Sequence, residues 1–123
     1  PNPSCWLVPV EDCAALGIAR HRDALIAVGW RVLTSPEDTV ARLSNKASFH
    51  TRAEELGLLR LLPLHYSSPE EATYPCVLKM AVGAYGAGTH IVRSAAEVAK
   101  YSEKAPREAL GTTWLLQELV TGR

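Results

Sequence analysis

The chain has 123 residues, and its 13 Lys and Arg residues balance 13 Asp and Glu residues, which gives a formal net charge of zero. This length suits a modest core, and the balanced charge excludes a global attraction to nucleic acid or to an anionic membrane. No apolar run approaches the roughly 20 residues of a membrane helix, and the chain does not open with the basic stretch of a secretory signal. We therefore expect a soluble, cytoplasmic protein in which any affinity for phosphate is local.

The first residues alternate between strand and helix patterns. Residues 5–10 form an apolar run with valines that predicts a buried strand. Residues 12–29 carry apolar side chains at mostly helical spacing and end on Gly29, a typical C-terminal stop. Residues 30–34 predict a second strand. The order of strand, helix and strand indicates an α/β arrangement.

Two further helices follow. Ser35 as N-cap and Pro36 at the first helical position, with acidic residues behind them, predict a helix over residues 35–46. Residues 47–56 predict another helix, which Gly57 ends. The three tryptophans are expected to be core anchors of their strands, because aromatic side chains bury large areas: Trp6, Trp30 and Trp114.

The second half of the chain has a different character. Residues 58–75 contain several prolines and predict a connector with one interrupted strand. Residues 76–81 and 89–93 predict two strands too close in sequence for a helix between them, and therefore an antiparallel hairpin. A helix begins at Ser94, where Glu97 completes a capping box. The last predicted strand is residues 113–119.

The tip of the hairpin is rich in glycine. The glycines of this tip are Gly83, Gly86 and Gly88. They are not a P-loop, because no lysine follows the last glycine. They are not a dinucleotide fingerprint either, because their order is G-x-x-G-x-G and a strand rather than a helix follows. Such a tip can present backbone N–H groups to an anion, with Lys79 on the preceding strand as counter-charge. Read in isolation, the same pattern also fits an exposed lysine beside an ordinary glycine turn.

Other polar residues indicate no site. The cysteines are odd in number and lack C-x-x-C or Cys/His spacing, which argues against a disulfide framework and against zinc: Cys5, Cys13 and Cys76. The histidines fall on different predicted elements with no shared face: His21, His50, His65 and His90. Only His90, two residues beyond Gly88, is a candidate to line a phosphate channel.

An ordered series of segments from residue 29 to residue 123 resembles the ATP-grasp superfamily, of the carboxylate–amine or carboxylate–thiol ligase type that includes biotin carboxylase, carbamoyl-phosphate synthetase and D-alanine ligase. The matching segments are GWRVLTSPEDTVARLSNK, ELGL, YPCVLKMAVGAYGAG, VRSAAEV and WLLQELVTGR. No single segment is specific, but their order is. The resemblance implies that residues 1–44 are the tail of a preceding α/β domain. Residues 45–123 would then be the first, nucleotide-binding lobe of an α/β (α+β) ATP-grasp fold.

The resemblance also implies roles for individual residues. Lys46 and Lys79 match the two lysines that contact the phosphates of ATP. The glycines already named, together with Tyr85, match the loop that covers the triphosphate. The segment that recognises the adenine edge through backbone groups corresponds to Gln117, Glu118, Leu119 and Val120.

This sequence departs from the family in two respects. Met80 follows the second lysine, where many relatives have proline. The acids that bind Mg²⁺ and the ribose have no counterpart before the last residue, Arg123, and are expected on a further lobe of a larger polypeptide.

The resemblance implies an enzyme that uses ATP and Mg²⁺ to convert a small-molecule carboxylate to an acyl phosphate, which an amine or another nucleophile then attacks. Its partners would be ATP and that carboxylate, with neither nucleic acid nor membrane. Two other functions remain open: a non-catalytic nucleotide-binding or regulatory module, and a plain α/β interaction domain whose hairpin binds nothing.

Overall fold

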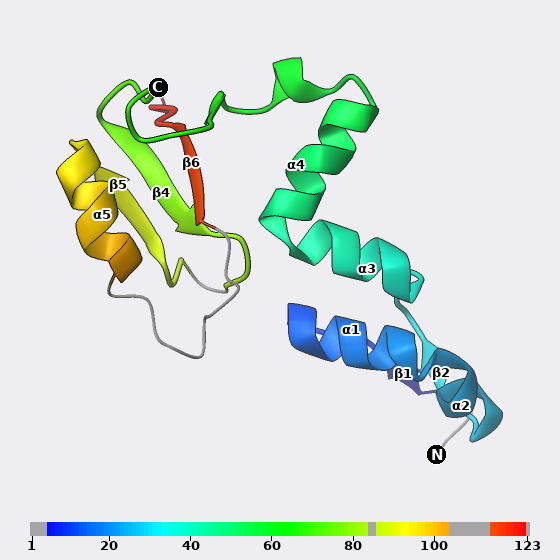
Figure 1. Cartoon of the computed structure of the whole chain (residues 1–123). Coiled ribbons are helices and arrows are strands. Elements are labelled where there is room, and N and C mark those ends of the chain that lie inside the picture. The colour runs from blue at the N-terminus through cyan, green and yellow to red at the C-terminus, as the bar shows by residue number, and fades with distance from the viewer. Residues whose placement is uncertain (1–4, 84–85, 104–113, 123) are drawn as a thin grey trace. The chain divides into compact units, whose positions relative to one another are not determined.

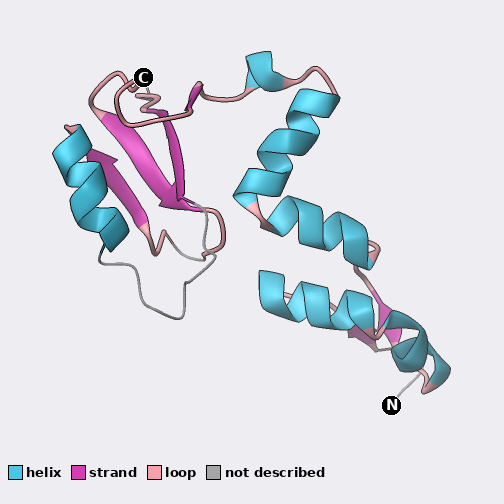
Figure 2. Cartoon of the chain, viewed as in Figure 1, coloured by secondary structure: helices cyan, strands magenta, loops and turns pink. Residues whose placement is uncertain are grey.

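The structure is a computed structural model in which residues 5–83, 86–103 and 114–122 are described. The chain divides into two compact units, residues 1–44 and 45–123, and each is described here by itself. Figure 1 labels the helices and strands, and Figure 2 separates them by colour. Both units contain helices and strands, so the mixed α and β class expected from the sequence is confirmed.

In the described part of the N-terminal unit, two helices lie between two strands, and one more helix follows. Its elements are β1 (Trp6–Leu7), α1 (Asp12–Arg20), α2 (Arg22–Ala27), β2 (Arg31–Val32) and α3 (Glu37–Ser44). The two strands pair in parallel, with Leu7 opposite Val32. This pairing is the α/β arrangement that the order of the sequence patterns predicts.

Two boundaries in this unit differ from the predicted ones. The single helix predicted over residues 12–29 is divided at His21, where Arg20 ends one helix and Asp23 lies in the first turn of the next. A basic residue at a C-terminus and an acidic residue in a first turn both favour that division. The following helix begins at Glu37, so Pro36 rather than Ser35 precedes it.

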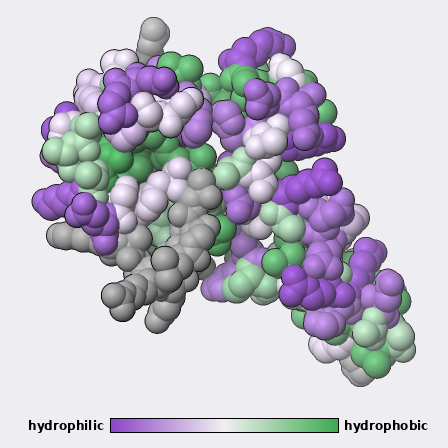
Figure 3. All heavy atoms as spheres, viewed as in Figure 1, coloured by the Kyte–Doolittle hydropathy of each residue, from purple (hydrophilic) through white to green (hydrophobic). Residues whose placement is uncertain are grey.

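Trp6 is not the core anchor that the sequence predicts. Its side chain is 56% exposed, and the Arg31 guanidinium lies 5.8 Å from the centre of its ring. Val8 and Leu33 in the same unit are also exposed, and Figure 3 shows hydrophobic residues at the surface of this unit. The short parallel pair therefore leaves apolar surface uncovered among the described residues.

The described residues of the C-terminal unit form two helices, a short 3₁₀ helix and one sheet. Its elements are α4 (Lys46–Glu55), η1 (Leu59–Leu61), β3 (His65–Tyr66), β4 (Cys76–Met80), β5 (Thr89–Val92), α5 (Ala95–Glu103) and β6 (Trp114–Glu118). Gly57, at φ +68°, follows the end of α4 in the left-handed region that glycine adopts without strain. No described helix is long and apolar enough to cross a membrane.

The sheet has the strand order β3-β6-β4-β5. All three pairings are antiparallel, and β4 and β5 form the hairpin predicted from the sequence. Lys79 on β4 lies opposite Thr89 on β5 and opposite Leu115 on β6. The hairpin therefore places the second candidate lysine directly beside the glycine loop.

The core of this unit lies between the sheet and α5. Leu78 is 1% exposed, and Cys76, Val92 and Leu116 are also buried against Val98 of α5. Successive side chains of a strand point to opposite faces of the sheet. Lys79 therefore lies on the face opposite α5, and α5 and α4 lie on different sides of the sheet in Figure 1.

The capping box predicted at the start of α5 forms only in part. The Ser94 hydroxyl oxygen accepts a hydrogen bond from the Glu97 N–H at 3.3 Å, as predicted. The Glu97 carboxylate accepts from the N–H of Arg93 at 2.8 Å, rather than from that of Ser94. Glu97 therefore still accepts a hydrogen bond from a backbone N–H in front of the helix, but from the residue before the one that a capping box uses.

Candidate anion-binding site

Lys46 is the first residue of α4, and Asn45 caps that helix. The Asn45 side-chain oxygen accepts hydrogen bonds from the N–H groups of Ala47 at 2.9 Å and Ser48 at 3.2 Å. The backbone N–H of Lys46 donates to the carbonyl oxygen of Ala81, just beyond β4, at 2.8 Å. The helix start is thus held against the end of the strand that carries Lys79.

The side chain of Lys46 reaches the glycine loop. Its Nζ donates a hydrogen bond to the Gly83 carbonyl oxygen at 3.3 Å. Lys79 is half-buried, and burial, followed by the positive charge of Lys46, lowers the pKa of its ammonium group. Two residues distant in sequence therefore bring their cations close enough to repel each other.

Neither lysine has a counter-charge within the described part of the chain. The ion pairs found there are Arg20 with Glu37 and Arg52 with Glu55, and neither includes Lys46 or Lys79. Partial burial of a cation beside a like charge costs free energy. A bound anion would offset that cost through charge-assisted hydrogen bonds. The donor set of the site therefore fits the oxygens of a phosphate group.

The described residues of the glycine loop have conformations and contacts that suit glycine. Gly86 and Gly88 have φ values of +76° and +69°, in the left-handed region. A Cβ atom at Gly83 would lie 3.0 Å from the Ala87 carbonyl oxygen, so the two sides of the loop approach closely. The N–H groups of Gly86, Ala87 and Gly88 donate to no other described residue. Tyr85, also a candidate, lies outside the described residues.

Met80, which departs from the family pattern, closes the base of the loop. Its backbone N–H donates to the Gly88 carbonyl oxygen at 2.9 Å. A Cβ atom at Gly88 would meet the Met80 side chain, at 2.7 Å from Cγ and closer still to Sδ. Proline has no N–H and could not donate this hydrogen bond. In this chain the loop therefore depends on a residue other than proline at position 80.

The four candidates for adenine recognition lie at and beyond the end of β6. Gln117 is buried on the strand, opposite His65 of β3 and Val77 of β4. The Glu118 carboxylate accepts a hydrogen bond from the Leu64 N–H at 3.3 Å, and the Glu118 N–H donates to the Leu64 carbonyl at 2.8 Å. The Glu118 side chain thus ties β6 to the start of β3. Leu119 and Val120 follow the strand, half-buried and exposed respectively.

The structure brings together two histidines that the sequence did not connect. The rings of His50 on α4 and His65 on β3 have centroids 4.6 Å apart. Burial, then His50 and then Lys79 lower the pKa of His65. The expectation that no two histidines share a face is therefore wrong for this pair. No local signal in the sequence connects the two residues, because they lie on elements that only the tertiary structure brings together.

His90, the histidine expected to be nearest the phosphates, lies on the sheet face opposite Lys79. It lies opposite the buried Leu78 in the register of the sheet, on the face covered by α5. Its ring stacks on Tyr101 of α5, with centroids 4.0 Å apart. The alternation of side chains along β5 explains the error, since Thr89 rather than His90 is paired with Lys79.

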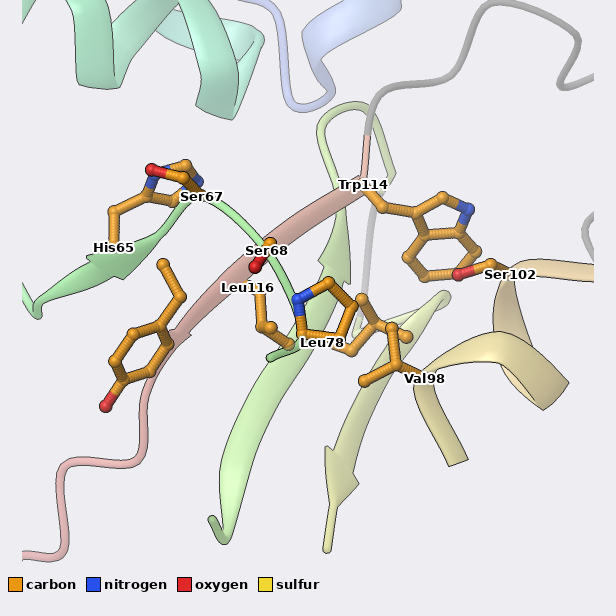
Figure 4. A pocket seen from close by; sticks show the side chains of 10 residues that line it. His65, Ser67, Ser68, Leu78, Val98, Ser102, Trp114 and Leu116 are labelled. Carbon is orange, nitrogen blue, oxygen red and sulfur yellow. The ribbon is translucent and has the colours of Figure 1, made fainter. Parts of the chain in front are cut away.

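A separate pocket of about 250 Å³ lies beside the core (Figure 4). Its walls include Leu78, Leu116, Val98 and Trp114. His65 and Ser67 lie at the opposite end of the pocket from Trp114 in this view. Leu78 and Leu116 belong to the face that α5 covers, whereas His65, at one end of the pocket, belongs to the face that presents Lys79.

The described residues contain no group of three His, Cys, Asp or Glu side chains that could hold a metal ion. Comparison of the sequence with models of known protein families finds no match, and comparison with curated proteins finds none either. The assignment of a function therefore rests on the residues and the geometry described above.

Proposed function

We propose that residues 45–123 bind the triphosphate of ATP on the sheet face that carries Lys79, as the nucleotide-binding lobe of an ATP-grasp ligase. One observation carries this proposal: Lys46 and Lys79 converge beside a glycine hairpin without a carboxylate partner among the described residues. Residues 1–44 are, in the same proposal, the end of the preceding α/β domain, and their parallel strand pair is consistent with that role.

In this proposal the two lysines act as electrostatic clamps and not as bases. Their ammonium groups offset the negative charge of the phosphate oxygens, which increases in the transition state of phosphoryl transfer. The N–H groups of Gly86 and Gly88 supply further donors, because residues without side chains let the backbone approach the oxygens. Lys46 must then exchange its hydrogen bond to the Gly83 carbonyl for one to the ligand.

The adenine ring is proposed to lie against the end of β6. The carboxylate of Glu118 is engaged with the Leu64 N–H, so the recognition of adenine is assigned to the Glu118 carbonyl and the Val120 N–H. Backbone groups that a strand already holds in place can recognise a purine edge with little loss of side-chain entropy. The half-buried Val77, on the same face as Lys79, would contact the ring.

The reaction proposed for the ligase is formation of an acyl phosphate from a carboxylate and ATP, followed by attack of an amine or another nucleophile. Mg²⁺ bound to ATP would supply additional positive charge at the phosphates. The proposal assigns that ion no protein ligand within the described residues, because they contain no suitable cluster.

Titration of the isotope-labelled chain with millimolar MgATP tests the nucleotide claim. The amide signals of Lys79, Gly83, Gly86 and Gly88 are expected to shift, and the thermal midpoint is expected to rise, because a ligand of the folded state stabilises it. Lys79→Ala should remove most of both effects. Lys100→Ala is the matched control, since this exposed lysine lies on α5, which covers the opposite face.

The same titration separates the remaining functions. The absence of any effect of MgATP, or an equal effect after Lys79→Ala, would overturn the nucleotide claim and favour an interaction domain. This chain by itself is expected to be inactive, because the acids that bind Mg²⁺ are expected on a further lobe. ADP formation is therefore assayed in the polypeptide that includes that lobe, where ATP binding without ADP formation in the presence of carboxylates and amines would favour a non-catalytic module over a ligase.

A further inference from the structure

His50 and His65 form a pair beside the candidate anion site. His50 comes from α4, the helix that begins with Lys46, and His65 from the edge strand β3. Their ring centroids are 4.6 Å apart, and both line a pocket of about 370 Å³ together with Glu54 and the apolar residues Leu59, Pro63 and Leu64. The pair is therefore accessible to a ligand as well as close to the sheet.

His65 belongs to the same face of the sheet as Lys79. It lies opposite Gln117 on β6, and Gln117 lies opposite Val77 on β4, two residues before Lys79. Neighbouring strands are about 4.8 Å apart, so β3 and β4 are separated by roughly 10 Å across this face. Two residues add roughly 6.6 Å along the strand, which puts the two backbones roughly 12 Å apart. Lys79 is accordingly the smallest of the three causes that lower the His65 pKa.

The surroundings of His65 favour its neutral form. Burial, then His50 on α4 and then Lys79 on β4 lower the pKa of His65. Glu54, in the same pocket, carries the opposite charge and by itself favours the protonated ring. Lys46, at the start of α4, adds positive charge beside Lys79. A polyphosphate bound at the two lysines would reverse the sign of this field, and a protonated imidazole would then be favoured.

We propose that His65, supported by His50, is a proton-dependent extension of the anion site, which takes up a proton from solvent when a nucleotide polyphosphate binds beside it. This inference rests on the proposed function, because it requires the polyphosphate at Lys46 and Lys79. It adds two binding residues from α4 and β3, and it predicts that affinity for ATP increases as the pH falls through the range in which imidazole titrates.

The direct test is the NMR titration of the His65 ring from pH 5 to pH 8.5, without ligand and with saturating ATP. Linkage requires that the rise in pKa on binding equals the logarithm of the gain in affinity of the protonated form. We expect a rise of about half a unit or more, which corresponds to roughly threefold tighter binding to the protonated protein. An unchanged His65 titration in the presence of bound ATP would overturn the inference.

Variants control for the titration of ATP itself, whose terminal phosphate changes charge near pH 6. The ratio of affinities at pH 5.5 and pH 8.0 is compared between the wild type, His65→Gln and His50→Gln, with folding checked by amide spectra. His65→Gln should lose about threefold of the wild-type ratio, because glutamine cannot take up the proton. His50→Gln leaves the His65 ring in place and should retain a larger ratio than His65→Gln, and His90→Gln, on the face covered by α5, should keep the full ratio. Equal ratios in the wild type and in His65→Gln would contradict the inference but leave nucleotide binding intact. No ATP binding at either pH would contradict the proposed function itself.

Discussion

The backbone N–H of Lys46 donates a hydrogen bond of 2.8 Å to the carbonyl oxygen of Ala81. This bond fixes the first residue of α4 at the end of β4, two residues beyond Lys79. Because helix and strand are held together at this point, the two ammonium groups remain near each other despite their mutual repulsion. The anion site therefore depends on the geometry of a helix start as much as on its two lysines.

Asn45→Ala removes the cap that holds this helix start. The loss of the hydrogen bonds to Ala47 and Ser48 is expected to lower the free energy of unfolding by about 1 kcal/mol. The affinity for MgATP should also fall, by roughly threefold or more, because Lys46 is no longer held in place. Urea unfolding and NMR titration measure the two effects.

Ser94→Ala is the matched control, because Ser94 caps α5 at the other side of the sheet. It should cost a similar amount of stability and leave the affinity unchanged. Equal losses of affinity in the two variants would show that stability alone, and not the position of Lys46, determines binding.

Lys79→Met is expected to stabilise the free protein while abolishing its response to nucleotide. The substitution removes a partly buried cation that has no counter-charge among the described residues, which should raise the free energy of unfolding by about 1 kcal/mol or less. Loss of a charged hydrogen-bond donor should weaken ATP binding by roughly tenfold or more. Thermal unfolding with and without MgATP measures both effects. A destabilised variant that still binds ATP would contradict the assignment of Lys79 to the anion site.

Gly88→Ala is expected to disrupt the hairpin loop. The alanine would have to adopt a left-handed backbone conformation, and its Cβ atom would lie 2.7 Å from Cγ of Met80. We expect a loss of about 2 kcal/mol of unfolding free energy and weaker ATP binding. Gly86→Ala, which has the same sign of φ but open space around it, should cost about 1 kcal/mol. Equal costs at the two positions would show that the contact with Met80 is unimportant.

The stability of the free protein is expected to depend on the protonation of His65. The pKa of His65 in the folded state lies below its ordinary value of 6.5, so the unfolded chain takes up this proton first as the pH falls. As the pH falls from 6.5 to the lowered pKa of the folded state, the free energy of unfolding therefore decreases, with a slope of at most about 1.4 kcal/mol per pH unit from this residue.

Urea unfolding in phosphate-free buffers between pH 5 and pH 8 measures this dependence. His65→Gln should make the decrease in stability at low pH less steep, because glutamine cannot take up the proton. The same slope in the wild type and in His65→Gln would show that other groups cause the dependence.

Local patterns predicted most elements of the second unit, including the hairpin of β4 and β5, because two apolar runs separated by a glycine loop leave few other pairings. They were less successful where neighbouring signals compete. Arg20 and Asp23 divide one predicted helix into two. The short strands β1 and β2 leave Trp6 exposed, although its residue type favours burial.

The sequence by itself determined the chemistry that is available: the lysines at positions 46 and 79, the glycines between two strands, and the order of the segments around them. It did so because charge, backbone freedom and hydrophobic period are local properties of residues. Only the tertiary structure decided which of these groups meet. The register of β4 directs Lys79 away from α5 and His90 toward it, and the path of α4 brings His50 to His65. Such contacts depend on pairings between distant segments, which no short stretch of sequence encodes.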